Sequence, residues 1–196
     1  MRLHDALDET LSTKARTRVA RILVGHRSHS LTGREVGRLS GLSPAQAREA
    51  LITLERTGLA DGTIAGRTKL WRLREEHVLA PHLVALFAAE KNVFPALTEE
   101  LRRFFARLPV KSVRLFGSAA RGAERPDSDI DLYVEVASEK DKAFIREKVG
   151  ELWVRGARRF GNPIMAVVYT TKERQADSGS GLIRSAFSDG TLIAGE

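Results

Sequence analysis

The sequence places a Gly-Ser pair between two strand-like runs, and this arrangement restricts the fold more than any other feature of the chain. The run Val110–Phe116 has the β-branched and aromatic content of a strand, and Gly117-Ser118 follows it directly. After ten intervening residues, Asp129-Ile130-Asp131-Leu132 begins a second strand. Alternate residues of a strand share one face, so the two Asp side chains project together and the two aliphatic side chains face the core. The sequence therefore predicts paired carboxylates near a sharp turn.

The residue types at this turn indicate chemistry on a phosphate. Asp129 and Asp131, two positions apart on a strand, can hold a hard divalent cation, which prefers oxygen ligands. Gly117 allows the backbone to turn sharply and to approach a phosphate group closely. Ser118 begins a predicted short helix over residues 118–123, where its hydroxyl and the free amides can bind phosphate oxygens. We expect a cation and a phosphate to meet between these two elements.

The pattern from Gly117-Ser118 to Asp129-x-Asp131 resembles the nucleotidyltransferase superfamily, which includes polymerase beta and the small bacterial minimal nucleotidyltransferases. Arg121-Gly122 and Ser128 are also similar to the minimal branch. The resemblance implies that Asp129 and Asp131 are catalytic ligands of Mg²⁺, and that Gly117, Ser118 and Arg121 bind the phosphates of an NTP, as substrate or ligand. In that family a hydroxyl attacks the alpha-phosphorus and pyrophosphate leaves, while the cations neutralise developing charge and align the reacting groups.

The third carboxylate of that family has no counterpart in the sequence. It usually lies on the next strand, and the predicted strand Pro163–Thr170 contains no acid. Glu135 shares the face of Asp131 but lies about 13 Å further along the strand, and Glu151 approaches only if its helix packs unusually. General-base assistance is typically worth about 10²–10⁴-fold in rate. The sequence is therefore compatible with slow transfer, with nucleotide binding alone, or with a disused pocket.

The first third of the chain carries the signals of three helices and a hairpin. A first helix lies within residues 8–24, and Thr32–Glu35 and Ser43–Gln46 each form the reciprocal cap that begins a helix. These two helices, over residues 33–40 and 44–57, are joined by about three residues. Strand-like runs at 59–64 and 68–73 flank a turn at 65–67. The segment resembles the winged helix-turn-helix domain of bacterial transcriptional regulators over about residues 10–76.

This resemblance implies binding of double-stranded DNA. The third helix would meet base edges in a major groove, and the hairpin, or wing, would contact phosphate or the minor groove. The candidate DNA-binding residues are Ser43, Gln46, Arg48, Glu49 and Thr53 of the helix, with Arg67 and Lys69 of the wing. Glu49 repels phosphate and can only accept a hydrogen bond from cytosine. Residues 1–80 hold 14 Lys and Arg against 9 Asp and Glu, which favours a nucleic acid. The alternative is a winged helix for protein contacts or dimerisation.

We predict a two-domain α/β protein. Residues 1–76 form the winged helix-turn-helix domain and residues 77–108 form a helical connector with helices at 81–91 and 95–108. Residues 109–196 form the nucleotidyltransferase-like domain, a mixed sheet with flanking helices. The chain has no Cys, which excludes disulfides and thiolate metal sites. No apolar run approaches the 18 residues that span a membrane, so we expect a cytoplasmic protein without membrane contact.

Three functions fit these features. The first is a DNA-binding regulator whose nucleotidyltransferase-fold module binds a nucleotide with Mg²⁺, with degenerate catalysis. The second is an active enzyme that transfers a nucleoside monophosphate to a protein, a small molecule or a nucleic acid. The third is an antitoxin-like component, because minimal nucleotidyltransferases occur as partners of HEPN-type toxins. A homodimer is expected where a winged-helix regulator reads two half-sites.

Overall fold

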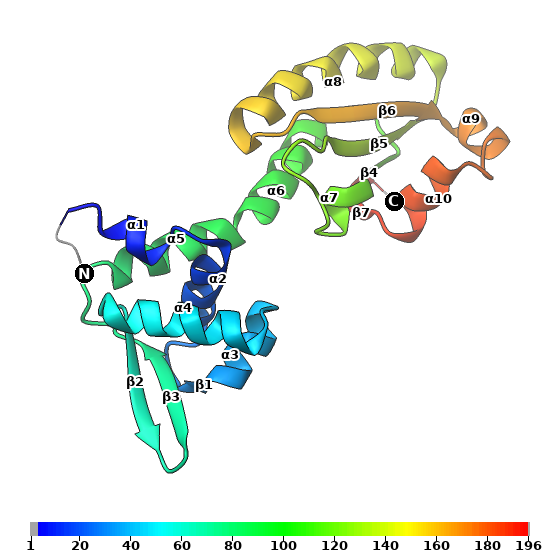
Figure 1. Cartoon of the computed structure of the whole chain (residues 1–196). Helices are drawn as coiled ribbons and strands as arrows, with labels where there is room; N and C mark the ends of the chain where they lie inside the picture. Colours follow the sequence, from blue (N-terminus) through cyan, green and yellow to red (C-terminus); the bar gives the residue numbers. More distant parts are fainter. Residues whose placement is uncertain (1–3, 196) are drawn as a thin grey trace. The chain divides into compact units, whose positions relative to one another are not determined.

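A computed structural model describes residues 4–195, which form two compact units with the division between Asn92 and Val93 (Figure 1). Within the described residues, no helix has both the length and the apolar character needed to cross a membrane. Each unit has its own hydrophobic core.

The N-terminal unit is a winged helix-turn-helix, as the sequence predicts. Its elements are α1 (Ala6–Thr10), α2 (Lys14–Gly25), β1 (Leu31–Thr32), α3 (Gly33–Ser40), α4 (Pro44–Arg56), β2 (Ala60–Ala65), β3 (Thr68–Leu73) and α5 (Ala80–Lys91). The three strands form an antiparallel sheet in the order β1-β3-β2. The β2–β3 hairpin is the wing, and it extends beyond the helices in Figure 1.

Both predicted helix caps are present. The Thr32 hydroxyl accepts a hydrogen bond from the Glu35 N–H, and the Glu35 carboxylate accepts from the Thr32 N–H at 2.7 Å. Ser43 and Gln46 make the same reciprocal pair at the start of α4. These bonds satisfy amides that the first helical turn leaves without partners, so they fix where α3 and α4 begin.

The C-terminal unit is a mixed sheet with flanking helices. Its elements are α6 (Val93–Phe105), β4 (Ser112–Phe116), α7 (Gly117–Ala120), β5 (Ile130–Val136), α8 (Glu139–Phe160), β6 (Ile164–Thr170), α9 (Thr171–Ala176), α10 (Gly181–Ser188) and β7 (Thr191–Gly195). The strand order is β6-β5-β4-β7. β5 and β6 are parallel, joined through α8, whereas β4 pairs with β5 and β7 in antiparallel fashion.

The two faces of this sheet differ in chemistry. On one face, Leu132 and Val134 of β5 are fully buried in a core that includes Ile145 and Leu152 of α8. The odd-numbered residues of β5 lie on the other face, where Ile183 and Ala186 of α10 pack against Tyr133 (Figure 1). The paired Asp residues therefore belong to the face opposite α8.

The structure divides the predicted connector, residues 77–108, between the two units. Leu83 and Phe87 of α5 are buried in the core of the N-terminal unit. Leu101 and Phe105 of α6 are buried in the core of the C-terminal unit. The physical reason is that each helix carries its own apolar stripe, and each stripe packs against a different core. The predicted domain limits at residues 76 and 108 stay predictions.

The helix after β5 is longer than predicted. The sequence places it at residues 138–154, whereas α8 continues to Phe160 and ends at Gly161, which has φ +81°. Glu100 of α6 supports the added turns through Arg159, whose Nη1 lies 3.0 Å from Glu100 Oε2. A contact this distant in sequence gives no local signal at the helix end.

An ion pair between the buried Lys142 and the partly exposed Glu173 joins α8 to α9 and makes the stability of this unit depend on pH. Lys142 is 8% exposed and bonds to Glu173, whose carboxylate also accepts from the Thr170 N–H. Lys142 and Thr170 lower the pKa of Glu173 from its ordinary 4.5 to about 2. A carboxyl group with a lowered pKa in the folded state stabilises the fold when it is ionised.

We predict that this stabilisation is complete above pH 4.5 and is lost as the pH falls from 4.5 toward 2. The measurement is the free energy of unfolding from pH 7 to pH 3, followed by Trp153 fluorescence in a Trp71→Phe background, with and without Glu173→Gln. The wild type should be more stable than Glu173→Gln at neutral pH, and the difference should shrink below pH 4.5. A difference that stays constant over this range would contradict the prediction.

Candidate functional site

The predicted turn and the predicted carboxylates meet in the structure. Phe116, the last residue of β4, pairs with Asp131 of β5. The chain then turns at Gly117, which has φ +76°, a conformation that residues with a side chain rarely adopt. A Cβ atom on Gly117 would lie 2.5 Å from Asp131 Oδ2. The carboxylate of Asp131 therefore lies directly against the backbone of the turn.

Asp129 and Asp131 concentrate negative charge at the start of β5. Asp129 is exposed just before the strand, and Asp131 is partly buried. Burial, and then the neighbouring charge of Asp129, raises the pKa of Asp131. In this environment the ionised form of the Asp131 carboxyl group is less stable than it is in water, and a bound cation would stabilise that form.

The donor set fits one cation that is shared with phosphate oxygens. Asp129 and Asp131 offer only oxygen ligands, which suit Mg²⁺. Among residues 4–195 no group of three or more His, Asp and Glu side chains could hold a metal ion. The remaining ligands would have to come from a bound phosphate or from water.

The position beside Asp131 on the next strand is occupied by a methionine. Met165 of β6 is in register with Asp131 and is 42% exposed. Glu135 is 6% exposed and lies 3.0 Å from Nε of Arg174. Glu151 is exposed on α8, which covers the opposite face of the sheet. The structure thus agrees with the sequence that neither glutamate replaces a third carboxylate.

Ser118 and Arg121 lie on the short helix and the loop that follow the turn. Ser118 is in α7, and Arg121 is the exposed residue that ends it. The loop then returns to Asp129 and is fastened by Asn162, whose Nδ2 donates to Ser128 O at 2.7 Å and to Pro126 O at 3.2 Å. Asn162 was not predicted as a site residue, because a bond over more than 30 residues leaves no pattern in the sequence.

The face that carries Asp131 continues into a polar cluster that the sequence did not reveal. Tyr133 follows Asp131 on this face and is fully buried, and Glu135 follows Tyr133. Burial, and then the Glu135 carboxylate, raises the pKa of Tyr133. Arg114 of β4 is in register with Tyr133, and Arg174 comes from α9. These residues come from three separate elements, and only strand register brings them together.

The predicted recognition helix presents most of its candidate residues to solvent. Ser43, Gln46, Arg48 and Glu49 are exposed on α4, although the side chains of Ser43 and Gln46 bond to each other in the helix cap. The prediction that Thr53 contacts DNA needs correction. Thr53 is only 7% exposed, so its side chain is not on the exposed surface of α4 and cannot reach a DNA groove. Packing of α2, α3 and β2 against α4 leaves a narrower exposed stripe than the sequence indicates.

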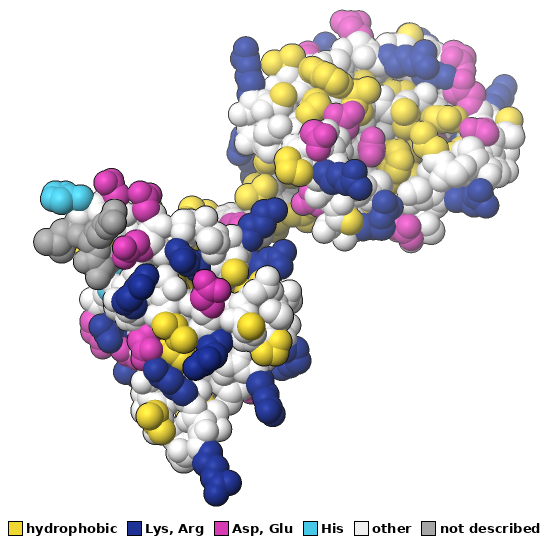
Figure 2. All heavy atoms as spheres, viewed as in Figure 1, with side chains coloured by type: hydrophobic (Ala, Val, Ile, Leu, Met, Phe, Trp, Pro, Cys, Tyr) yellow, Lys and Arg dark blue, Asp and Glu magenta, His cyan; other side chains and the backbone are white. Residues whose placement is uncertain are grey.

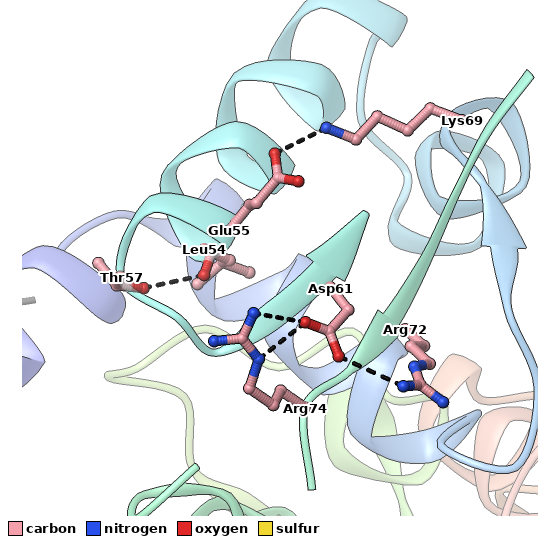
Figure 3. A network of polar contacts seen from close by, with 7 residues as sticks. All are labelled: Leu54, Glu55, Thr57, Asp61, Lys69, Arg72 and Arg74. Atoms are coloured by element: carbon pink, nitrogen blue, oxygen red, sulfur yellow. Dashed lines mark hydrogen bonds and ion pairs between the residues drawn. The ribbon is translucent and has the colours of Figure 1, made fainter. Parts of the chain in front are cut away.

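One ion pair ties the wing to the recognition helix, and two more lie at the base of the wing itself (Figure 3). Lys69 Nζ lies 2.8 Å from Glu55 Oε2 of α4 and 4.4 Å from the centre of the Trp71 ring. Asp61 of β2 similarly holds two arginines of the hairpin, Arg72 and Arg74. Lys69 is therefore engaged within the protein, whereas Arg67 is exposed in the turn between β2 and β3. Figure 2 shows a basic side chain at the tip of this hairpin.

We predict that Gly117→Ala destabilises the C-terminal unit more than Gly122→Ala does. Both glycines have positive φ, +76° and +62°, so each alanine has the conformational cost of about 1–2 kcal/mol that left-handed backbone imposes. Only at Gly117 does the new methyl group also meet a neighbour, the Asp131 carboxylate, since nothing lies within 4 Å of the position at Gly122. Urea unfolding of the two variants measures the difference, and equal losses of stability would refute the close contact.

Comparisons with known proteins match different parts of the chain to different proteins. Residues 97–175 match a family model described as "Nucleotidyltransferase domain". The comparison with curated proteins gives no significant match. One similar solved structure is described as a "predicted DNA-binding transcriptional regulator from E. coli", with 25% identity over 45% of this chain and 85% of that chain, and a TM-score of 0.37.

Lactococcus lactis ZitR in complex with DNA is also similar, at 22% identity over 43% of this chain and 60% of the ZitR chain, with a TM-score of 0.36. A ZitR mutant matches at 23% identity over 42% of this chain and 60% of that chain, with a TM-score of 0.37. For the C-terminal unit, the geometry at Gly117 and Asp131 and the family model indicate the same kind of domain. The protein carries a nucleotidyltransferase domain in its C-terminal part, over residues 97–175.

Proposed function

We propose that the protein is a DNA-binding regulator whose nucleotidyltransferase domain binds a nucleoside triphosphate together with Mg²⁺. The approach of Asp131 to the Gly117 turn carries the nucleotide part of this proposal, because it puts carboxylate oxygens beside backbone that a phosphate can also approach. The exposed stripe of α4 with the wing supports the DNA part.

In the nucleotide site, each residue has a distinct task. Ser118 would donate its hydroxyl to a phosphate oxygen, and Arg121 would supply positive charge from the loop. Asp129 and Asp131 would hold Mg²⁺, which neutralises phosphate charge when it is bound. Gly117 supplies the space that lets the turn and the carboxylate lie in contact.

The surroundings of Asp131 favour binding over rapid transfer. Met165, in register beside it, can neither ligate Mg²⁺ well nor accept a proton from an attacking hydroxyl. Glu135 is paired with Arg174 and is buried. Among the described residues, a third carboxylate that could activate a nucleophile beside Asp129 and Asp131 is therefore absent.

Slow nucleotidyl transfer is the second candidate function, since the Gly-Ser turn and both Asp residues lie within the matched domain, residues 97–175. In such a step an acceptor hydroxyl would bond to the alpha-phosphorus and lose its proton to water, the bond from that phosphorus to the oxygen bridging to the beta-phosphorus would break, and pyrophosphate would leave. A homodimer, a HEPN-type toxin partner and a cytoplasmic location stay predictions.

In the N-terminal unit, Arg48 of α4 is exposed and has the chemistry for bidentate recognition of guanine. Arg67 at the tip of the wing would contact phosphate or the minor groove. Arg48 is bordered by Ser43, Gln46 and Glu49. The Gln46 side chain would have to break its hydrogen bond with Ser43 in the helix cap before it could contact a base.

We predict that NTP binding requires Mg²⁺ and falls at least tenfold in Asp131→Asn, because the amide cannot ligate the cation as a carboxylate does. Calorimetric titration of each NTP, with and without Mg²⁺, measures this, and Asp127→Asn in the exposed loop is the control that should bind normally. Asp131→Asn should remain folded, since the fold already disfavours a charge at this position. Failure of the wild type to bind any NTP would overturn the nucleotide part, and release of pyrophosphate in the same samples would select the transferase.

We predict that Arg48→Ala with Arg67→Ala weakens DNA binding by about tenfold or more, since a bidentate base contact contributes about 1–3 kcal/mol. The slope of affinity against salt should fall by about 0.9 for a lost phosphate contact. The probe is duplex DNA enriched from a random library by the wild type, measured by fluorescence anisotropy. Arg146→Ala with Arg158→Ala removes the same charge from exposed positions of α8 and should bind like the wild type. Equal loss in both double variants would refute the recognition surface.

A further inference from the structure

Four buried donor atoms that make no hydrogen bond gather on one face of the C-terminal sheet, and one of them, Arg174 Nε, has an ion-pair partner in Glu135. Within residues 4–195, five buried side-chain atoms lack a hydrogen-bond partner. Four of these atoms, all able to donate, are Ser112 Oγ, Arg114 Nε, Tyr133 Oη and Arg174 Nε. We refer to these four residues as the donor cluster.

Strand register explains why the donor cluster is one site. In the β4–β5 pair, Arg114 lies opposite Tyr133, and Ser112 lies opposite Glu135. Arg174 joins them from α9, with its Nε 3.0 Å from Glu135 Oε2. Arg114, Arg174 and the Glu135 carboxylate therefore lie on the same face of the sheet, with Arg174 paired to Glu135.

Buried donors of this kind cost free energy unless an acceptor is supplied. Folded proteins bond nearly all of their buried polar groups, so four exceptions in one place need an explanation. Glu135 pairs with Arg174 and lies close to Tyr133, whereas Ser112 Oγ and Arg114 Nε have no acceptor among the described residues. The group that would satisfy them is an oxyanion, because it offers several acceptor lone pairs and balances the excess positive charge.

The donor cluster adjoins the nucleotide site on the same face. Tyr133 is the next residue after Asp131 on this side of β5, and two residues of a strand span about 6.8 Å. A ligand bound at Gly117 and Asp131 would therefore lie within about this distance of the donor cluster.

The ring of Phe187 in α10 covers the donor cluster. The guanidinium carbons of Arg114 and Arg174 lie 4.6 and 5.7 Å from the centre of this ring, and the ring of Tyr133 packs edge-on against it at 5.4 Å. Phe187 is 39% exposed. Phe187 is therefore a partly exposed side chain that lies over the cluster, together with Tyr169, whose ring is 5.7 Å from that of Tyr133.

We propose that the donor cluster is a second anion-binding subsite, which takes a phosphate or carboxylate group. This inference rests on the proposed function for what lies at Asp131, but the anion subsite itself is tested separately. The anionic group belongs either to the bound nucleotide or to a second molecule, such as the acceptor of a transfer reaction.

The test is the binding of inorganic phosphate to the full chain, compared with acetate and with chloride at equal ionic strength. Calorimetry and thermal unfolding both report it, since a ligand of the folded state raises the unfolding temperature. We expect phosphate or acetate to bind and to stabilise the wild type, whereas chloride does not. The absence of any effect of both oxyanions would overturn the proposal.

Tyr133→Phe is the decisive variant, because it removes one donor and keeps the buried ring. We expect its affinity for the oxyanion to fall by about tenfold, as expected for a hydrogen bond to a charged group, with no loss of thermal stability. Arg114→Met should abolish the effect, and Arg184→Met on the exposed side of α10 should leave it unchanged. Equal binding by the wild type and Tyr133→Phe would place the anion elsewhere, at Ser118 for example, and would refute the subsite.

Two further experiments test the anion subsite separately from the proposed nucleotide site. Asp131→Asn should keep the oxyanion effect even though we expect it to lose Mg²⁺-dependent nucleotide binding. Saturation of the wild type with NTP and Mg²⁺ then identifies the source of the anion: phosphate that still binds marks a subsite for a second molecule, and phosphate that is displaced marks part of the nucleotide. Nucleotide binding without any Tyr133-dependent oxyanion effect would overturn the subsite alone.

Discussion

The alternation of side chains along β5 is the constraint on which the C-terminal unit depends. Its even-numbered residues, Ile130, Leu132, Val134 and Val136, are all buried in the core formed with α6 and α8. Its odd-numbered residues are polar and point to the other face, from Asp131 through Tyr133 to Glu135. A shift of register by one residue would bury the carboxylates in that core, so the same hydrophobic pattern that stabilises the fold also positions the site.

The features that the sequence predicts well are local ones. The two capping boxes lie within four residues each, and the structure has both. The turn at Gly117 and the carboxylate strand follow from short patterns, and their contact follows from pairing of adjacent strands. The missing third carboxylate was also evident, because β6 contains no acid.

The features that the sequence did not predict depend on distant contacts. Thr53 is buried because α2, α3 and β2 surround α4. Helical periodicity alone does not predict how much of the α4 surface these elements bury. Lys69 has the charge of a phosphate ligand, but Glu55 lies close enough to hold it. The donor cluster draws on β4, β5 and α9, so its residues are ordinary in sequence and distinctive only after the sheet has formed.

The ion pair between the wing and α4, together with those at the base of the wing, bears on how the N-terminal unit would select DNA. Glu55 holds the strand that ends the wing, and Asp61 joins the two strands of the hairpin near its base. On the proposed function, the distance between the base-reading helix and the backbone-reading wing is then set by the protein. A duplex whose groove width does not match that distance must deform to be bound, and stiff sequences resist such deformation. Selectivity would therefore extend to base pairs that no side chain touches.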